Sequence, residues 1–166
     1  MPKVFTPVPL ERKHPRKEFD SGDAILNAWL TQYSVQAQKK GSSKSYVSLD
    51  EEGRIAGFYS LVYGQVEREL APEEITKGMP KHPIPVLIVA RLAVDLDFQR
   101  MGLGKSLLKD AMTRALSAAQ IAGLRAVVVH AKHEQAAAFY QHFGFLPSKD
   151  EPLILMLPIS KIAEAY

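Results

Sequence analysis

The sequence predicts a mixed α/β fold in one domain that spans residues 1–166. A near-continuous apolar run at 86–94 is typical of a strand buried on both faces. An amphipathic helix begins at Leu103 and stops at Gly123, and a second apolar strand follows at 126–130. A strand–helix–strand connection of about thirty residues is almost always right-handed and makes the two strands parallel.

The part of the chain before this unit predicts a short strand and a helix. Residues 4–8 form a β-prone run that Pro9 closes. Asp23 is expected to cap a helix that ends at Gly41. The apolar residues of this helix recur at three- and four-residue intervals, so we expect them to face the core, at Leu26, Trp29, Leu30 and Tyr33.

The next segments predict a β-hairpin and an irregular excursion. Residues 46–49 and 54–66 read as two antiparallel strands around a turn at 50–53, with core candidates at Ile55, Phe58, Leu61 and Val62. Residues 72–85 contain four prolines, so we expect a surface segment with one helical turn at 73–75.

The last third of the chain predicts one helix and the strands that complete the sheet. The helix covers 134–143 and ends at Gly144. The closing strands are expected at 145–146 and 153–157.

The composition excludes several classes of protein and of site. There is no cysteine, so disulfide scaffolds, cysteine-based zinc sites, iron–sulfur clusters and thiol nucleophiles are excluded. No apolar run approaches the roughly 20 residues that span a bilayer, and residues 1–5 lack the apolar stretch of a signal peptide. We therefore expect a cytoplasmic protein that does not contact a membrane.

The charge is mildly basic and unevenly distributed. The formal net charge is +3, with Lys and Arg in excess over residues 1–49 and acidic residues gathered at 50–52 and 67–74. Such segregation attracts a polyanion to one face, although a solvated surface is the simpler explanation.

The turn between the apolar strand and its helix, Gln99–Lys105, carries the most chemical information. The first amides of a helix have no intrahelical partner, and Gly102 and Gly104 let a ligand approach the backbone closely. With the helix dipole and the charges of Arg100 and Lys105, these amides form a site for a diphosphate. The alternative is that the two glycines serve only the turn.

Two other phosphate-binding patterns fail at this turn. Gly104-Lys105-Ser106 matches the end of a P-loop, but Gln99 stands where that motif requires glycine. The dinucleotide pattern G-x-G-x-x-G fails because Leu107 occupies its third glycine position.

The segment from Gln99 to Gly104 resembles the Q/R-x-x-G-x-G/A signature of the GNAT superfamily of acyl-CoA-dependent N-acetyltransferases. The order of predicted elements also resembles the GNAT fold, a mixed central sheet with splayed parallel strands flanked by helices. The resemblance implies that acetyl-CoA is the cosubstrate and that the backbone of Leu92, Ala93 and Val94 faces its pantetheine arm. It assigns the diphosphate to Gln99, Arg100, Met101, Gly102, Leu103, Gly104 and Lys105.

Shorter segments resemble the GNAT toxins of bacterial toxin–antitoxin pairs, at 26–30, 46–47, 90–94, 129–131, 139–140 and 144–145. Those toxins acetylate the α-amine of aminoacyl-tRNA and so block translation. The resemblance implies the same substrate here, a ribbon-helix-helix antitoxin as partner and a homodimer. That subfamily often has an arginine before the second strand, where this chain has Lys44, which weakens a bidentate phosphate contact.

Tyr140 matches the tyrosine that GNAT enzymes commonly use as general acid. Its usual pKa of about 10 exceeds the value of about 8.5 for a thiol, so it stays protonated at pH 7 and can protonate a thiolate leaving group. The alternative is a tyrosine that only packs beside Phe139 and Phe143. Acetyl transfer is expected to be direct, because no cysteine is available to carry the acetyl group.

No general base is evident from the sequence. The strand at 86–94 contains neither a carboxylate nor a histidine, and His130 at the end of the next strand is the nearest candidate. A lysine amine, with a pKa of about 10.4, requires a base, whereas an α-amine of about 7.7–8.0 requires little help, and esterification lowers it further. The missing base therefore favours an aminoacyl ester as the acceptor over lysine.

Candidate contacts to tRNA phosphates are Arg91, Lys44, Lys77, Lys81 and the basic loop 12–17. The spacing of the histidines matches no zinc site, so we expect no metal. Two alternatives to the toxin remain: an N-acetyltransferase for small amines or protein amino groups, and a module that binds an acyl-CoA or an RNA without turnover.

Overall fold

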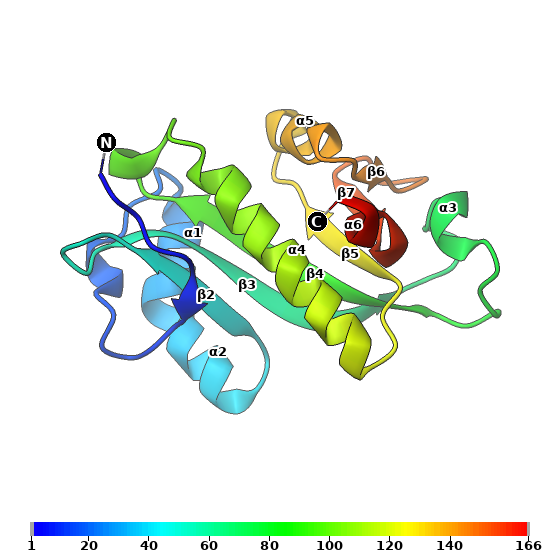
Figure 1. The fold of residues 1–166 in the computed structure, drawn as a ribbon, viewed down its shortest axis with the longest axis horizontal. Coiled ribbons are helices and arrows are strands. Elements are labelled where there is room, and N and C mark those ends of the chain that lie inside the picture. Colours follow the sequence, from blue (N-terminus) through cyan, green and yellow to red (C-terminus); the bar gives the residue numbers. More distant parts are fainter. Residues whose placement is uncertain (1, 166) are drawn as a thin grey trace. The chain divides into compact units, whose positions relative to one another are not determined.

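The computed structural model describes residues 2–165, and its strands form one seven-stranded mixed sheet (Figure 1). The strand order is β1-β2-β3-β4-β5-β7-β6. The strands are β1 (Val8–Pro9), β2 (Lys44–Leu49), β3 (Ile55–Val66), β4 (Ile84–Val94), β5 (Ala126–His130), β6 (Leu146–Pro147) and β7 (Ile154–Pro158). The parallel pair is β4–β5, as predicted from the strand–helix–strand pattern.

The helices are α1 (Ala24–Ala28), α2 (Ser34–Lys40), α3 (Glu73–Thr76), α4 (Leu103–Ile121), α5 (Glu134–His142) and α6 (Ile159–Ala165). Short helical turns are η1 (Arg16–Glu18), η2 (Trp29–Tyr33) and η3 (Leu96–Phe98). The chain divides into two compact units, Met1–Val62 with Ala90–Ala111 and Tyr63–Val89 with Met112–Tyr166. The elements β3, β4 and α4 each contribute residues to both units. The single domain over residues 1–166 stays a prediction.

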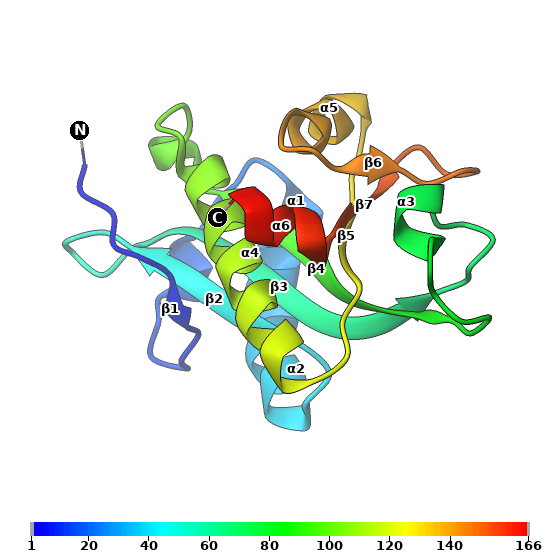
Figure 2. The ribbon, with the colours of Figure 1, turned by 45° about the vertical axis from the view of Figure 1, so that its right-hand side comes forward.

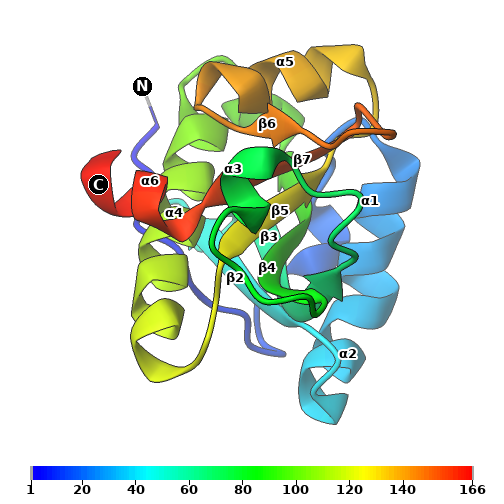
Figure 3. The same ribbon diagram turned by 90° about the vertical axis from the view of Figure 1, so that its right-hand side faces the viewer.

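In the first unit, α1, η2 and α2 follow one another without a break (Figure 3). Asp23 caps α1 as predicted, accepting hydrogen bonds from the amides of Ile25 (2.9 Å) and Leu26 (3.1 Å). Gly41 ends α2 with a φ of 79°. The prediction was wrong for Tyr33, which is 57% exposed, because η2 is a π-helix whose wider turn shifts the face of the residues that follow.

The first unit's strands enclose a compact apolar cluster. Strand β2 pairs antiparallel with β1 and with β3, as Figure 2 shows. Gly57 in β3 is required by packing, since a Cβ there would lie 2.9 Å from Leu107 and 3.1 Å from the carbonyl oxygen of Ala93. The buried cluster consists of Leu10, Phe19, Leu30, Val47, Ile55, Phe58 and Ala93.

In the second unit, parallel pairing joins Val86–Val89 to Ala126–Val129. Strand β4 continues to Val94, with no further pairing to β5 among residues 2–165.

Two parts of the second unit differ from the predictions. The segment 72–85 is not wholly superficial, because Ile75 and Ile84 are fully buried in a cluster with Val86, Val128 and Met156. Helix α6 was not predicted; it contacts β7, and its Ile162 is fully buried. No helix in the described part of the chain is long and apolar enough to cross a membrane.

Candidate active site

The signature turn leads into α4 with a backbone conformation that leaves several amides without partners. Arg100 has a φ of 65° and Gly102 a φ of 79°. The first helical bond runs from the amide of Ser106 to the carbonyl of Gly102 (3.1 Å). No residue among 2–165 accepts a hydrogen bond from the amides of Leu103, Gly104 or Lys105. These three donors at the positive end of a 19-residue helix suit an anionic group.

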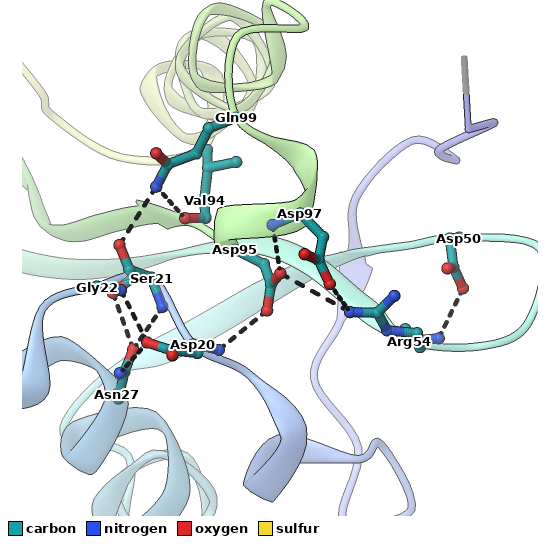
Figure 4. Close-up of polar contacts among 10 residues, drawn as sticks. All are labelled: Asp20, Ser21, Gly22, Asn27, Asp50, Arg54, Val94, Asp95, Asp97 and Gln99. Atoms are coloured by element: carbon teal, nitrogen blue, oxygen red, sulfur yellow. Dashed lines mark hydrogen bonds and ion pairs between the residues drawn. The ribbon is translucent and has the colours of Figure 1, made fainter.

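The side chain of Gln99 is bound within the protein. Its Nε2 donates to the carbonyl of Val94 (3.0 Å) and to the carbonyl of Ser21 (3.2 Å), as Figure 4 shows. The Nε2 group of Gln99 is therefore engaged within the protein, and the exposed side chains of Arg100 and Lys105 can add positive charge.

The end of β4 supplies the other predicted cofactor residues. Ala93 is 6% exposed, and Leu92 and Val94 are half-buried. The structure brings Val94 and Gln99 together through the hydrogen bond just described.

Arg91, on β4, lies over an aromatic ring. Its guanidinium carbon is 3.9 Å from the ring centroid of Trp29, and that ring stacks on Phe58 at 6.1 Å. Burial lowers the pKa of Arg91, yet the group stays charged at neutral pH. Arg91 forms no ion pair with a carboxylate among residues 2–165. An orientated cation without an internal counter-ion suits an anionic ligand.

The remaining predicted substrate residues are exposed. Lys44 stands at the start of β2 and His130 at the end of β5. In the second unit, no hydrogen bond or ring contact joins His130 to Tyr140 within the described chain.

Tyr140 lies on α5, which His133 caps by accepting a hydrogen bond from the amide of Ala136 (3.1 Å). The ring is 8% exposed and meets Phe139 and Phe145 edge-on, with centroids at 5.2 and 5.7 Å. Burial raises the pKa of Tyr140 to about 12, so the group stays protonated across the neutral range. Its hydroxyl has no hydrogen-bond partner among residues 2–165, which leaves it able to donate to a ligand.

Sequence reasoning missed the polar residues that support the turn. Asp95 is 3% exposed and accepts hydrogen bonds from the amides of Asp20 and Asp97, both at 2.9 Å. Asp95 stands just before η3, and Asp is common at that position because its side chain accepts an amide of the turn. The bond to the Asp97 amide could therefore have been predicted from the sequence, whereas no local pattern points to the bond with Asp20. No group of three metal-binding side chains occurs in the described residues.

Comparison with known proteins identifies the family. A family model described as an acetyltransferase (GNAT) domain matches residues 42–147. The chain is 43% identical over 139 residues to a tRNA-acetylating toxin of Mycobacterium tuberculosis (strain ATCC 25618 / H37Rv), covering 84% of this chain and 82% of that protein.

Solved structures agree with this result. AtaT complexed with acetyl-methionyl-tRNAfMet matches with a TM-score of 0.90 and 27% identity, over 98% of this chain and 99% of that one. A Tyr-to-Phe mutant of KacT matches with a TM-score of 0.87 and 26% identity, over 92% of each chain. The sequence signature and these matches together show that the chain belongs to the GNAT acetyltransferase family.

Proposed function

We propose that this protein is an acetyl-CoA-dependent toxin that acetylates the α-amine of aminoacyl-tRNA and so blocks translation. The observation that carries the proposal is the similarity to a tRNA-acetylating toxin across most of both chains. The similarity to AtaT, which was solved with an acetylated aminoacyl-tRNA, supports the same acceptor.

The turn before α4 fits the diphosphate of acetyl-CoA. The unpartnered amides of Leu103–Lys105 supply donors, Gly102 supplies the positive φ, and Arg100 and Lys105 supply charge. AtaT has been solved with acetyl-CoA, which supports this assignment. The backbone of Leu92, Ala93 and Val94 would hold the pantetheine arm, and Gln99 and Met101 would contribute through their main chains.

We assign Tyr140 as the general acid. The acceptor amine attacks the thioester carbon directly, so that the C–N bond forms as the C–S bond breaks and the nitrogen releases a proton. The Tyr140 hydroxyl makes no hydrogen bond within the described chain, so it can stabilise and protonate the sulfur as negative charge develops on the sulfur. Tyr-to-Phe mutants of both AtaT and KacT have been solved, which supports a role for a tyrosine in this group of toxins.

An α-amine suits the residues present. Strand β4 contains no carboxylate and no histidine that could deprotonate a lysine amine. The α-amine of an aminoacyl ester has a much lower pKa and needs little or no base. On the acceptor side we assign Arg91 and Lys44 to tRNA phosphates, and His130 to the neighbourhood of the amine.

The partners follow from the same similarity. AtaT has been solved bound to the C-terminus of its antitoxin AtaR. We infer that this chain also has an antitoxin, that the antitoxin is a ribbon-helix-helix protein, and that the toxin forms a homodimer. Aminoacyl-tRNA and acetyl-CoA meet in the cytoplasm, so we place the protein there.

The test offers labelled acetyl-CoA to the purified protein with aminoacyl-tRNA, a polyamine or a lysine peptide as acceptor. We expect label on aminoacyl-tRNA alone, lost on deacylation of the tRNA. Label only on the polyamine or the peptide would contradict the acceptor. Binding of acetyl-CoA in calorimetry without transfer to any acceptor would favour a binding module.

A further inference from the structure

The segment that precedes α1 is hydrogen-bonded to the residues that follow β4. The buried Asp95 carboxylate accepts the amide of Asp20 at 2.9 Å, and the amide of Leu96 donates to the carbonyl of Asp20 at 2.8 Å. Both backbone polar groups of Asp20 are therefore held by residues that immediately follow β4. The guanidinium of Arg54 lies 3.8 Å from the Asp95 carboxylate and 2.8 Å from the Asp97 carboxylate, so it adds a positive charge beside the two acidic groups (Figure 4).

The same segment also has hydrogen bonds within itself. One oxygen of Asp20 accepts the amide of Gly22 and the side-chain amide of Asn27, both at 2.9 Å. The side-chain oxygen of Asn27 accepts the amide of Ser21 at 2.8 Å. Figure 4 shows these side chains converging on one point ahead of α1. The start of α1 therefore takes its position from this network.

Gln99 is the link between this network and the signature turn. One amide group has two hydrogens, and Gln99 directs its amide at two carbonyls, of Val94 on β4 and of Ser21 ahead of α1. A residue that only bound a ligand would not need both internal bonds. The side chain instead sets the distance between the turn and the segment at 20–23.

The helical segment positioned in this way carries two exposed apolar side chains and one ring that a cation covers. Ile25 is 73% exposed and Tyr33 is 57% exposed, and Trp29 stands between them at four-residue spacing beneath Arg91. Arg91 lies over the half-buried ring of Trp29, and the exposed aromatic Tyr33 follows four residues later on the same segment. An arginine without a counter-ion and an exposed aromatic ring are both groups that bind single-stranded nucleic acid. This face suits the unpaired acceptor end of a tRNA.

We propose that Gln99 is a positioning residue that fixes the acceptor-binding segment α1–η2 to the cofactor turn. The role rests on the proposed function, because it requires that α1–η2 meets the tRNA. It is a role of the side chain, beside the main-chain contribution to the diphosphate site that the family signature implies for Gln99.

The first test measures amide hydrogen exchange over residues 20–27. In Gln99→Ala both bonds are lost, and in Gln99→Glu a carboxylate of the same length replaces the donors, so we expect faster exchange in both variants. Gln99→Arg restores donors to the two carbonyls and should restore slow exchange. The matched control is Gln120→Ala, an exposed glutamine on α4 without a side-chain hydrogen bond in the described chain. Unchanged exchange at 20–27 in Gln99→Ala would refute the proposal.

The second test separates the two substrates. For Gln99→Ala we expect KM for aminoacyl-tRNA to rise about threefold to tenfold, as the loss of two modest hydrogen bonds allows, with Kd for acetyl-CoA within about twofold of wild type. A loss of acetyl-CoA affinity with an unchanged acceptor KM would make Gln99 a cofactor ligand and overturn the positioning role. If the wild-type protein acetylates no aminoacyl-tRNA, the proposed function fails, while the exchange result still decides whether Gln99 holds the segment.

Discussion

Tyr140 combines a nearly buried ring with a hydroxyl that has no partner in the described chain. The ring packs on Phe139 and Phe145, so removal of the oxygen leaves the apolar contacts in place. We expect Tyr140→Phe to fold normally, to bind acetyl-CoA within about twofold of wild type and to lower kcat by about 10²–10⁴. Single-turnover acetyl transfer and calorimetry measure the two effects. Tyr63→Phe is the control, since Tyr63 is 66% exposed; equal rates for wild type and Tyr140→Phe would remove the assignment.

The raised pKa of Tyr140 also predicts a pH profile. A tyrosine with a pKa of about 12 does not ionise below pH 10, so kcat should show no fall from its deprotonation between pH 8 and about 10. A fall in the wild type near pH 10 that Tyr140→Phe lacks would show that the hydroxyl titrates at its ordinary value.

His14 predicts a pH dependence of stability. Its imidazole is 7% exposed and its Nδ1 accepts the amide of Glu11 at 2.9 Å, which requires the neutral form at that nitrogen. Burial lowers the pKa of His14 below its usual value of 6.5. The unfolded chain therefore binds the proton more readily, and this stability is full above pH 6.5 and is lost as the pH falls towards the lowered pKa.

The change His14→Asn keeps an acceptor for the Glu11 amide and removes the titration. We expect the wild type to lose more unfolding free energy than His14→Asn between pH 7.5 and pH 5.5. Urea unfolding at the two pH values measures it. Parallel losses in both proteins would exclude His14 as the cause.

At the scale of elements, the start of α4 depends on one glycine. Gly102 has a φ of 79°, whereas Gly123, beyond the end of α4, has no positive φ, and a Cβ at either position would meet no atom within 4 Å. The two glycines therefore differ in backbone conformation and not in the room available for a Cβ. We expect Gly102→Ala to lower the unfolding free energy by about 1–2 kcal/mol and to weaken acetyl-CoA binding, because an L-residue resists the left-handed region.

Gly123→Ala is the control and should leave both quantities nearly unchanged. Urea unfolding and calorimetry with acetyl-CoA provide the measurements. Equal behaviour of the two variants would show that the turn does not need its left-handed residue for binding.

At the scale of the whole molecule, the charge distribution predicts a salt effect. Tight contacts to tRNA phosphates release counter-ions, so KM for aminoacyl-tRNA should rise steeply as NaCl is raised from about 50 to about 200 mM. Arg91→Ala and Lys44→Ala should each reduce the slope of log KM against log salt concentration by about 0.7–1. Lys161, which lies 3.8 Å from Glu164, supplies the control Lys161→Ala with an unchanged slope. Slopes that do not respond to Arg91 or Lys44 would exclude these residues as phosphate contacts.

The pattern of the chain was sufficient for most of the strands and helices, because apolar periodicity and capping residues act over a few neighbours. The strand–helix–strand unit, the Asp23 cap and the Gly41 terminus follow from such local signals. The face of Tyr33 was mispredicted because a π-helical turn arises from tertiary packing, and α6 was missed because its seven residues show little periodicity. Ile75 was misplaced for a related reason, since proline content describes backbone irregularity and not burial.

The amino-acid sequence by itself determined the family and the turn that we propose as the cofactor site, since both depend on residues close together in the chain whose backbone conformation is restricted by glycine. Only the tertiary structure decided which side chains support that turn. Asp20 and Asp95 are 75 positions apart, and Ser21 and Gln99 are 78 apart, so no local pattern links them. Their hydrogen bonds form only when the chain brings the end of β4 beside the segment ahead of α1, and burial of the Asp95 carboxylate makes it costly to leave that group unpaired.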